Sequence, residues 1–490
     1  MLMKRDLISR LVFGLAFSGL VLGSCGASKD DGGTEVPPSP EKPAVTGEYG
    51  LDPQAVKDFF ASAVKGVDAS WTKEGELAPD QIAGASDYVW GLWKTALEMN
   101  VPEKLPALSS HQSLKDWGDI YKSDAMWSLP EGGMSIFYGS KGEKPASGYP
   151  LFLFLHGSGS DAGEEWRTSL SWAQYFKEGS SVYFVPKSPQ GGTGCRWYQP
   201  SRQAKWEQLL KQALVSDDIN HDKIYFMGIS EGAYGTQRLA SFYADYLAGA
   251  GPIAGGELLA SCPPENLANI AYCHQTGELD TSYGRDRLTK KVGGILDGLQ
   301  NAHPGLYIHK VNLQPGKDHG CDYTVTNPWL VNYSRNTAPK YVYWENYGLG
   351  GINGEPLRYR DSFYNLYIVK PSDDRTDDLY RTVYEMDIDG NTIDLTVRNV
   401  TLRLSEPVSI YGWDANLGVE KTYSPATTGK VRIYLNSDLV DLSKPVTVKV
   451  NGVEKFNGTV EPDTRNLVES CAIFYDPARI FPASVEVSVD

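Results

Sequence analysis

The chain has 490 residues, of which 41% are hydrophobic and 11% aromatic, so it can build two or three ordinary domains and is not a disordered protein. Its formal net charge of −15 argues against a surface that binds nucleic acid or anionic membranes. After the N-terminus there is no apolar run of about 20 residues, so we expect the body of the protein to be soluble.

The N-terminus has the features of an export signal. Lys4 and Arg5 precede an apolar stretch over 11–22, which is too short to cross a hydrocarbon layer of about 30 Å. The stretch runs into Leu-Gly-Ser-Cys, which resembles the lipobox of bacterial lipoproteins. The resemblance implies that residues 1–24 are a signal peptide and that Cys25 is lipidated. An ordinary secretory signal with an incidental cysteine is the alternative.

A tether follows the cysteine and completes the segment 25–50. The letters GASKDDGG predict a flexible stretch, and EVPPSPEKP predicts one stiffened by proline. The pair Asp30-Asp31 resembles the surface-export signal of some Gram-negative lipoproteins. We therefore expect a protein that contacts the outer membrane through its lipid anchor only, at the cell surface or, as the alternative, on the periplasmic face.

Two helices are predicted first in the body of the chain, at 52–67 and 78–99 within the segment 51–120. Asp52 has the properties of a helix N-cap and is followed by Pro53, a residue favoured in the first helical turn. Strand signals then appear at 132–139 and 149–157.

From residue 149 onwards, buried-strand runs alternate with amphipathic helices. The further strands are expected at 181–186, 223–228, 248–256, 269–274 and 306–313, and the helices between them at 202–215, 234–246 and 285–300. Such repeats predict a parallel sheet that is covered by helices on both faces.

A Gly-x-Ser-x-Gly motif lies within this region. Ser230 stands between Gly228 and Gly232, directly after a predicted strand and before a predicted helix. The flanking glycines would permit the sharp turn that lifts a nucleophilic hydroxyl clear of a sheet. The pentapeptide alone would also fit a plain strand-to-helix turn, so the decision depends on the remaining members of a catalytic triad.

An acid and a base follow in the order that this arrangement requires. Asp280 lies in the loop after the strand at 269–274, and His319 lies in the loop after the next strand. His319 would accept the Ser230 proton, and Asp280 would hold the imidazole in the correct tautomer. Glu278 is the alternative acid. The histidines expected to be structural or at the surface are His111, His221, His274, His303 and His309.

The loop after the strand at 149–157 is a candidate for the oxyanion hole. Its sequence His-Gly-Ser-Gly would allow close approach of the backbone to a tetrahedral intermediate. The expected donors are the backbone N–H of Glu231 and that of Gly157 or Ser158. A tight turn without a catalytic role is the alternative.

These motifs resemble those of the α/β-hydrolases over residues 125–330. The segments HGSGS, GISEGAYG, AGPIAGG, TGELD and KDHG occur in the order found in secreted esterases grouped with polyhydroxybutyrate depolymerases, feruloyl esterases and acetyl xylan esterases. The flanks are more similar to carbohydrate esterases encoded with gut polysaccharide-utilisation systems. The resemblance implies a serine esterase that needs no cofactor and no metal.

A further segment is similar to the pocket-lining Cys-Trp-x-Trp stretch of those esterases, but here it reads Cys-Arg-Trp-Tyr. The resemblance places Arg196, Trp197 and Tyr198 at the substrate. Arg196 would pair with a uronate carboxylate or with a carboxylate of the protein itself. Trp197 and Tyr198 would stack on a sugar or phenolic ring.

The C-terminal part, 350–490, predicts a different architecture. Its strands alternate with period two, and Asn451-Gly452 and Asn457-Gly458 are hairpin-turn signals. We expect a small β-sandwich that either binds carbohydrate or braces the catalytic domain, which we place at 121–349.

The cysteines of an exported protein can form disulfides. A working triad would bring the loops after Cys273 and before Cys321 together, so these two are the predicted pair. Cys195 with Cys262 is the second candidate, which leaves Cys471 over. The alternative is that all five are buried as small apolar side chains.

The sequence therefore predicts an α/β-hydrolase domain with a C-terminal β-sandwich, acting as a serine carboxylesterase. The expected partner is esterified plant polysaccharide or oligosaccharide carrying acetyl, feruloyl or methyl ester groups. A pectin methyl esterase, a peptidase of the prolyl oligopeptidase type and a non-catalytic sugar-binding lipoprotein are the alternatives.

Overall fold

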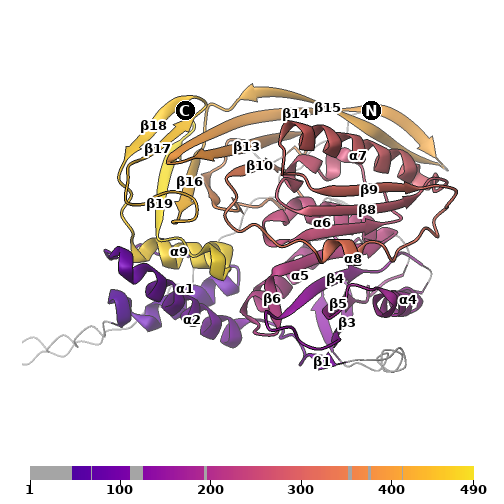
Figure 1. The fold of residues 1–490 in the computed structure, drawn as a ribbon, viewed down its shortest axis with the longest axis horizontal. Coiled ribbons are helices and arrows are strands. Elements are labelled where there is room, and N and C mark those ends of the chain that lie inside the picture. Colours follow the sequence, from indigo (N-terminus) through magenta and orange to yellow (C-terminus); the bar gives the residue numbers. More distant parts are fainter. Residues whose placement is uncertain are drawn as a thin grey trace, which may run out of the picture. The chain divides into compact units, whose positions relative to one another are not determined.

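The computed structural model describes residues 47–67, 69–110, 125–159, 161–191, 196–350, 356–373, 377–410 and 412–490 (Figure 1). All of them belong to one compact unit, Val45–Asp490. The predicted signal peptide, the lipidation site Cys25 and most of the tether lie outside the described residues, as do His111 and Cys195. No helix in the described ranges is long and apolar enough to span a membrane.

The two predicted N-terminal helices are present as α1 (Pro53–Val64) and α2 (Ile82–Asn100). The Asp52 side chain caps α1 by accepting hydrogen bonds from two backbone N–H groups of its first turn. The two helices pack through Phe60 and Trp93, whose rings meet edge to face at 5.3 Å. Both helices also contact α9 (Thr464–Phe474), which comes from the far end of the chain.

The central sheet has the order β1-β3-β5-β4-β6-β7-β8-β9, with β2 paired to β3. The strands from β4 to β9 run parallel, whereas β3 is antiparallel to β2 and β5. The bounds are β1 Ser109–Ser110, β2 Met126–Leu129, β3 Gly132–Lys141, β4 Tyr149–Leu155, β5 Ser181–Pro186, β6 Ile219–Ile229, β7 Gly249–Ile253, β8 Ala271–Gly277 and β9 His309–Gln314.

Both faces of this sheet are buried under helices. In β4, Leu153 faces one apolar cluster with Trp206 of α5, and Phe154 faces the other with Trp166 of α4. The helices are α4 Ala162–Tyr175, α5 Pro200–Val215, α6 Glu231–Phe242, α7 Arg285–Ala302 and the short α8 Asn327–Leu330. The prediction of an α/β-hydrolase fold is confirmed.

The C-terminal part contains two sheets. One has the order β10-β13-β14-β17-β18, with β15 paired to β14, and the other has the order β11-β12-β16-β19. The first sheet contains β10 Tyr341–Asn346, β13 Tyr380–Asp389, β14 Thr392–Ile410, β15 Trp413–Pro425, β17 Val446–Val450 and β18 Val453–Gly458. The second contains β11 Ser362–Phe363, β12 Leu366–Lys370, β16 Lys430–Leu435 and β19 Ala483–Ser488.

The two sheets share one apolar core, in which the rings of Trp344 from β10 and Phe363 from β11 stack at 5.4 Å. This arrangement fits the predicted β-sandwich. Asn451 and Gly452 both have positive φ and form the hairpin turn between β17 and β18, as predicted. The second turn signal is wrong, because Asn457 and Gly458 lie inside β18 and pair with β17.

A buried group of charges ties the sandwich side of the chain to the hydrolase. Asp245, which follows α6, accepts hydrogen bonds from Arg360 and from Arg479. Arg479 also donates to Asp476 at 2.7 Å, and Asp476 pairs with Arg335. Because all five side chains are buried, removing one partner would leave an uncompensated charge in the interior.

Candidate active site

Ser230 lies on a sharp turn between β6 and α6. Its backbone has φ 57° and ψ −113°, a conformation that non-glycine residues rarely adopt. A side chain at Gly228 would come within 2.9 Å of the Cα of Gly232, and one at Gly232 would come within 2.6 Å of the carbonyl carbon of Leu155. Both glycines are therefore needed for close backbone approach, as a nucleophile elbow requires.

The structure brings the three predicted triad residues together. Nε2 of His319 lies 3.1 Å from Oγ of Ser230, and Nδ1 of His319 lies 2.7 Å from Oδ2 of Asp280. Asp280 follows β8 and His319 follows β9, so adjacent parallel strands deliver both side chains to the same sheet edge. An Nδ1–H that donates to Asp280 leaves Nε2 free to accept the Ser230 proton.

The competing candidates are occupied elsewhere. Glu278 Oε2 accepts a hydrogen bond from the backbone N–H of Gly316, which ties the acid loop to the base loop. His274 is fully buried in β8 and bonds through Nε2 to the carbonyl of Gly255. The remaining described histidines also have local partners: the Ser216 carbonyl for His221, the Tyr341 ring for His303 and the Tyr307 carbonyl for His309.

Arg285, at the start of α7, is a member of the site that the sequence reasoning missed. Its guanidinium donates to Oδ1 of Asp280 at 2.9 Å and to the hydroxyl of Tyr234 at 2.7 Å. Burial alone would raise the pKa of Asp280, but the hydrogen bond from His319 and the charge of Arg285 outweigh it and lower that pKa. A positive charge in the first turn of a helix is unfavourable, because it faces the positive end of the helix dipole. An arginine at this position therefore indicates a nearby carboxylate that compensates for it.

The loop after β4 lies directly over the nucleophile. A side chain at Gly157 would come within 3.4 Å of Cβ of Ser230, so the backbone of this loop can approach a bound substrate closely. Glu231 is the first residue of α6, where a backbone N–H has no partner inside the helix. Gly157, Ser158 and Glu231 thus lie beside Ser230, and their role as oxyanion donors stays a prediction.

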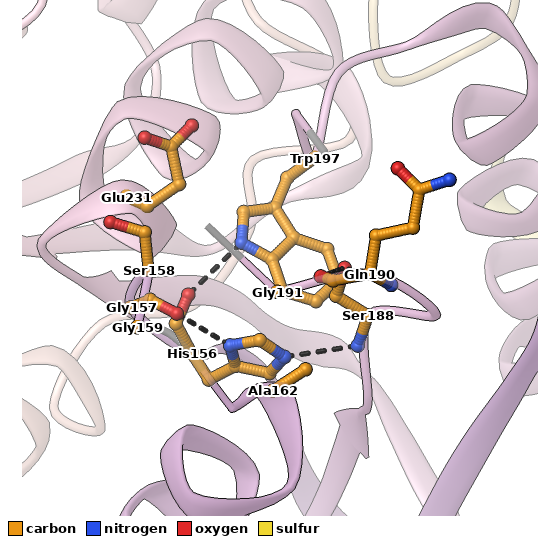
Figure 2. A pocket seen from close by; sticks show the side chains of 10 residues that line it. All are labelled: His156, Gly157, Ser158, Gly159, Ala162, Ser188, Gln190, Gly191, Trp197 and Glu231. Atoms are coloured by element: carbon orange, nitrogen blue, oxygen red, sulfur yellow. Dashed lines mark hydrogen bonds between the residues drawn. The ribbon is translucent and has the colours of Figure 1, made fainter. Parts of the chain in front are cut away.

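The buried His156 holds this loop in place (Figure 2). The backbone N–H of Ser188 donates to His156 Nε2 at 2.9 Å, so the ring proton is on Nδ1, which donates to the Gly157 carbonyl at 2.6 Å. Burial lowers the pKa of His156 to about 4, so the ring stays neutral at ordinary pH. Fixing the Gly157 carbonyl also fixes the direction of the N–H of Ser158 across the same planar peptide bond.

The three residues predicted to bind substrate have different roles. Arg196 forms an ion pair with the buried carboxylate of Glu231. Of its two predicted roles, the structure thus shows pairing with a carboxylate of the protein itself. The stacking role predicted for Trp197 is wrong, because this residue is only 1% exposed and its indole N–H donates to the His156 carbonyl at 3.0 Å. Tyr198 lines the cavity at the nucleophile, with the guanidinium of Arg238 4.0 Å from its ring centre.

This cavity has a volume of about 380 Å³, within the usual range for small-molecule sites. Ser230 and Ser158 lie in its wall, beside the aromatic side chains of Tyr198, Tyr234 and Tyr283. The wall also includes Trp413, which belongs to the C-terminal sandwich. No local pattern around Trp413 in the sequence marked it as a site residue.

The predicted disulfide between Cys273 and Cys321 is absent, since the four described cysteines are free and buried. Cys273 lies inside β8, about 13 Å before the end of that strand, whereas the triad joins the loops beyond the strand ends. Its sulfur accepts a hydrogen bond from Gln275 at 3.4 Å. Burial raises the pKa of Cys273 to about 11, so it behaves as a small apolar side chain, the alternative given above.

Fold and site together define an α/β-hydrolase fold with a serine–histidine–aspartate triad. No protein-family model matches the sequence. A stretch of 133 residues is 30% identical to poly(3-hydroxyalkanoate) depolymerase C of Paucimonas lemoignei, covering 26% of this chain and 32% of that enzyme. The chain thus spans about a third of the length of this curated relative.

Solved structures of esterases are remotely similar to this chain. One is described as a thermostable esterase, with 23% identity, a TM-score of 0.33 and coverage of 43% of this chain and 62% of that one. Another is a carboxylesterase from Mesorhizobium loti, with 18% identity, a TM-score of 0.31 and coverage of 42% and 99%. The strand order and the nucleophile elbow of the chain itself define the fold.

Proposed function

We propose that the protein is a serine carboxylesterase. The observation that carries this proposal is the hydrogen-bonded series from Ser230 through His319 to Asp280, placed at a strained elbow beside two sources of backbone N–H. The depolymerase relative, an ester-cleaving enzyme by its name, is consistent with it.

The geometry supports a two-step mechanism. Oγ of Ser230 attacks the ester carbonyl carbon while its proton moves to Nε2 of His319. The carbonyl oxygen becomes an oxyanion, which accepts hydrogen bonds from the backbone of Glu231 and of the loop at Ser158. Collapse of this intermediate expels the alcohol, which takes the proton from Nε2. Water then repeats the sequence on the acyl-serine, releases the acid and restores the hydroxyl.

The substrate class we propose is esterified plant polysaccharide, with acetyl or feruloyl groups favoured over methyl-esterified uronates. Three arginines line the cavity, and each already has a carboxylate partner in the protein: Glu231 for Arg196, Glu257 for Arg238 and Asp280 for Arg285. A uronate carboxylate would have to compete with these pairs, whereas an uncharged ester would not.

We also propose that the enzyme is held at the outer membrane by a lipid on Cys25, facing the cell surface. The lipobox-like sequence and the acidic pair Asp30-Asp31 support this location. Mass spectrometry of the N-terminal peptide from the membrane fraction should find a lipid-modified Cys25 at its N-terminus, and Cys25→Ala should abolish the modification. An unmodified peptide that begins elsewhere would contradict the proposal.

The activity is tested with the variant Ser230→Ala. Wild-type protein is assayed on acetylated and feruloylated xylan, methyl-esterified pectin and a peptide amide, and the released acid, methanol or amine is measured. The variant should lose at least about a thousandfold in rate while keeping its melting temperature. Ser62→Ala, on the surface of α1, is the matched control and should keep full activity. A Ser230→Ala protein within tenfold of wild type would remove Ser230 from the mechanism.

A further inference from the structure

The hairpin of β14 and β15 extends from the sandwich to the catalytic domain (Figure 1). Ile410 and Trp413 pair at its tip, where the two strands are joined. Further back, Glu406 of β14 forms a 2.6 Å ion pair with Lys291 of α7. A segment far along the chain is therefore attached to the helix that follows the catalytic acid.

The hairpin is also packed against the acid loop itself. A side chain at Gly284 would come within 3.3 Å of Leu417 and 3.6 Å of Ile410, so these hairpin side chains lie against the loop at Gly284. Tyr283 and Gly284 have successive φ values of 54° and 68°. A non-glycine residue is held in this conformation only where its surroundings determine it, and here the hairpin lies against it.

The contact produces an aromatic wall at the mouth of the site. The rings of Tyr283 and Trp413 meet edge to face, with their centres 5.7 Å apart and their planes at 80°. Tyr283 is 43% exposed, and both residues line the cavity that contains Ser230. Arg285, which positions Asp280, lies with its guanidinium 5.2 Å from the centre of the Tyr283 ring.

We propose that Trp413, together with Tyr283, binds a flat ring attached to the scissile ester and so determines which esters the enzyme prefers. Aromatic faces of this kind bind aryl rings and the apolar faces of sugars, and the cavity joins this wall to the nucleophile. The ring can be the aryl group of the acid or the sugar of the alcohol. The sandwich would then act as part of the catalytic site rather than as a brace. The inference rests on the proposed esterase function.

The test compares Trp413→Ala and Trp413→Phe with wild type on three esters. Ethyl acetate has no ring, methyl ferulate has a ring in the acid, and acetylated xylo-oligosaccharide has a ring in the alcohol. For Trp413→Ala we expect kcat/KM for a ring-bearing ester, divided by that for ethyl acetate, to fall about tenfold. Trp413→Phe should recover most of this ratio. The ester whose ratio falls identifies which ring is bound.

A matched control on the same hairpin is Arg403→Ala, whose exposed side chain pairs with Glu420 across the strands. It should leave all three rates unchanged. Equal losses on all three esters in Trp413→Ala, or no change in either ratio, would overturn the inference.

Binding separates this inference from the esterase proposal. The affinity of the intact ring-bearing ester is measured by calorimetry in Ser230→Ala with and without Trp413→Ala. If the wild type hydrolyses none of the esters, the proposed function fails. Weaker binding in the double variant than in Ser230→Ala alone would still support the ring site. Equal dissociation constants for Ser230→Ala and for the double variant with Trp413→Ala would refute the ring site.

Discussion

Replacing Gly232 by alanine is expected to disable the site while the chain still folds. The new Cβ would lie 2.6 Å from the carbonyl carbon of Leu155 and 2.9 Å from the carbonyl oxygen of His156. Ordinary contacts between such atoms are about 3.5–4.0 Å, so the start of α6 and the end of β4 must separate by roughly 1 Å. Ser230 lies at the start of α6, and the oxyanion loop directly follows β4.

A displacement of this size should lower kcat/KM about a hundredfold, which corresponds to about 2.7 kcal/mol of transition-state stabilisation. The overpacking should also cost about 1–3 kcal/mol in the free energy of unfolding. Initial rates of acid release from a simple acyl ester measure the first effect, and urea unfolding measures the second.

The chain offers a matched control for this substitution. Gly298 is exposed on α7, and a Cβ there would meet no atom within 4 Å. Gly298→Ala should therefore keep full activity and raise the free energy of unfolding by roughly 0.5–1 kcal/mol. A Gly232→Ala protein that keeps kcat/KM within threefold of wild type would show that this glycine does not set the position of the nucleophile.

The remaining predictions concern the buried charges. Arg285→Met should lower kcat roughly tenfold or more, because Asp280 loses the Oδ1 donor that fixes it against His319, and should raise the pKa of Asp280, which this charge helps to lower. A kcat within threefold of wild type in stopped assays would contradict the positioning role. Asp476→Asn should lower the free energy of unfolding by about 3–5 kcal/mol in urea denaturation, since it removes the buried carboxylate that Arg335 and Arg479 share. A loss below about 1 kcal/mol would count against this. Burial alone would raise the pKa of Asp476, but the charges of the two arginines outweigh it and lower that pKa to about 2. The ionised Asp476 therefore contributes its full stabilisation above the unfolded-state pKa of about 4, and this stabilisation is lost as the pH falls through about 2. The free energy of unfolding of the wild type should fall by about 2–3 kcal/mol over that window from this group. The drop should be absent from Asp476→Asn.

The positions of Ser230, Asp280 and His319 were predictable because each follows a buried strand of a parallel sheet. Strand runs and their ends are local properties of the sequence, and the carboxyl ends of parallel strands meet at one edge. The same local logic predicted the helices α1 and α2, the strands of the sandwich and the turn at Asn451-Gly452.

Other features depended on contacts between distant segments, which no local pattern encodes. Trp197 has the composition of a stacking residue, yet the fold encloses its ring under His156. The triad predicted that Cys273 and Cys321 would lie close together, but strand geometry leaves both as free thiols.

By itself, then, the sequence determined the class of fold, the candidate triad and the oxyanion loop, because strand and turn propensities act over a few residues. Only the tertiary structure decided that Arg285 holds Asp280 and that Trp413 enters the cavity, since both depend on where separate segments pack. Trp413 lies far from Ser230 along the chain, and the pairing of β14 with β15 together with the packing of that hairpin on the acid loop brings it there.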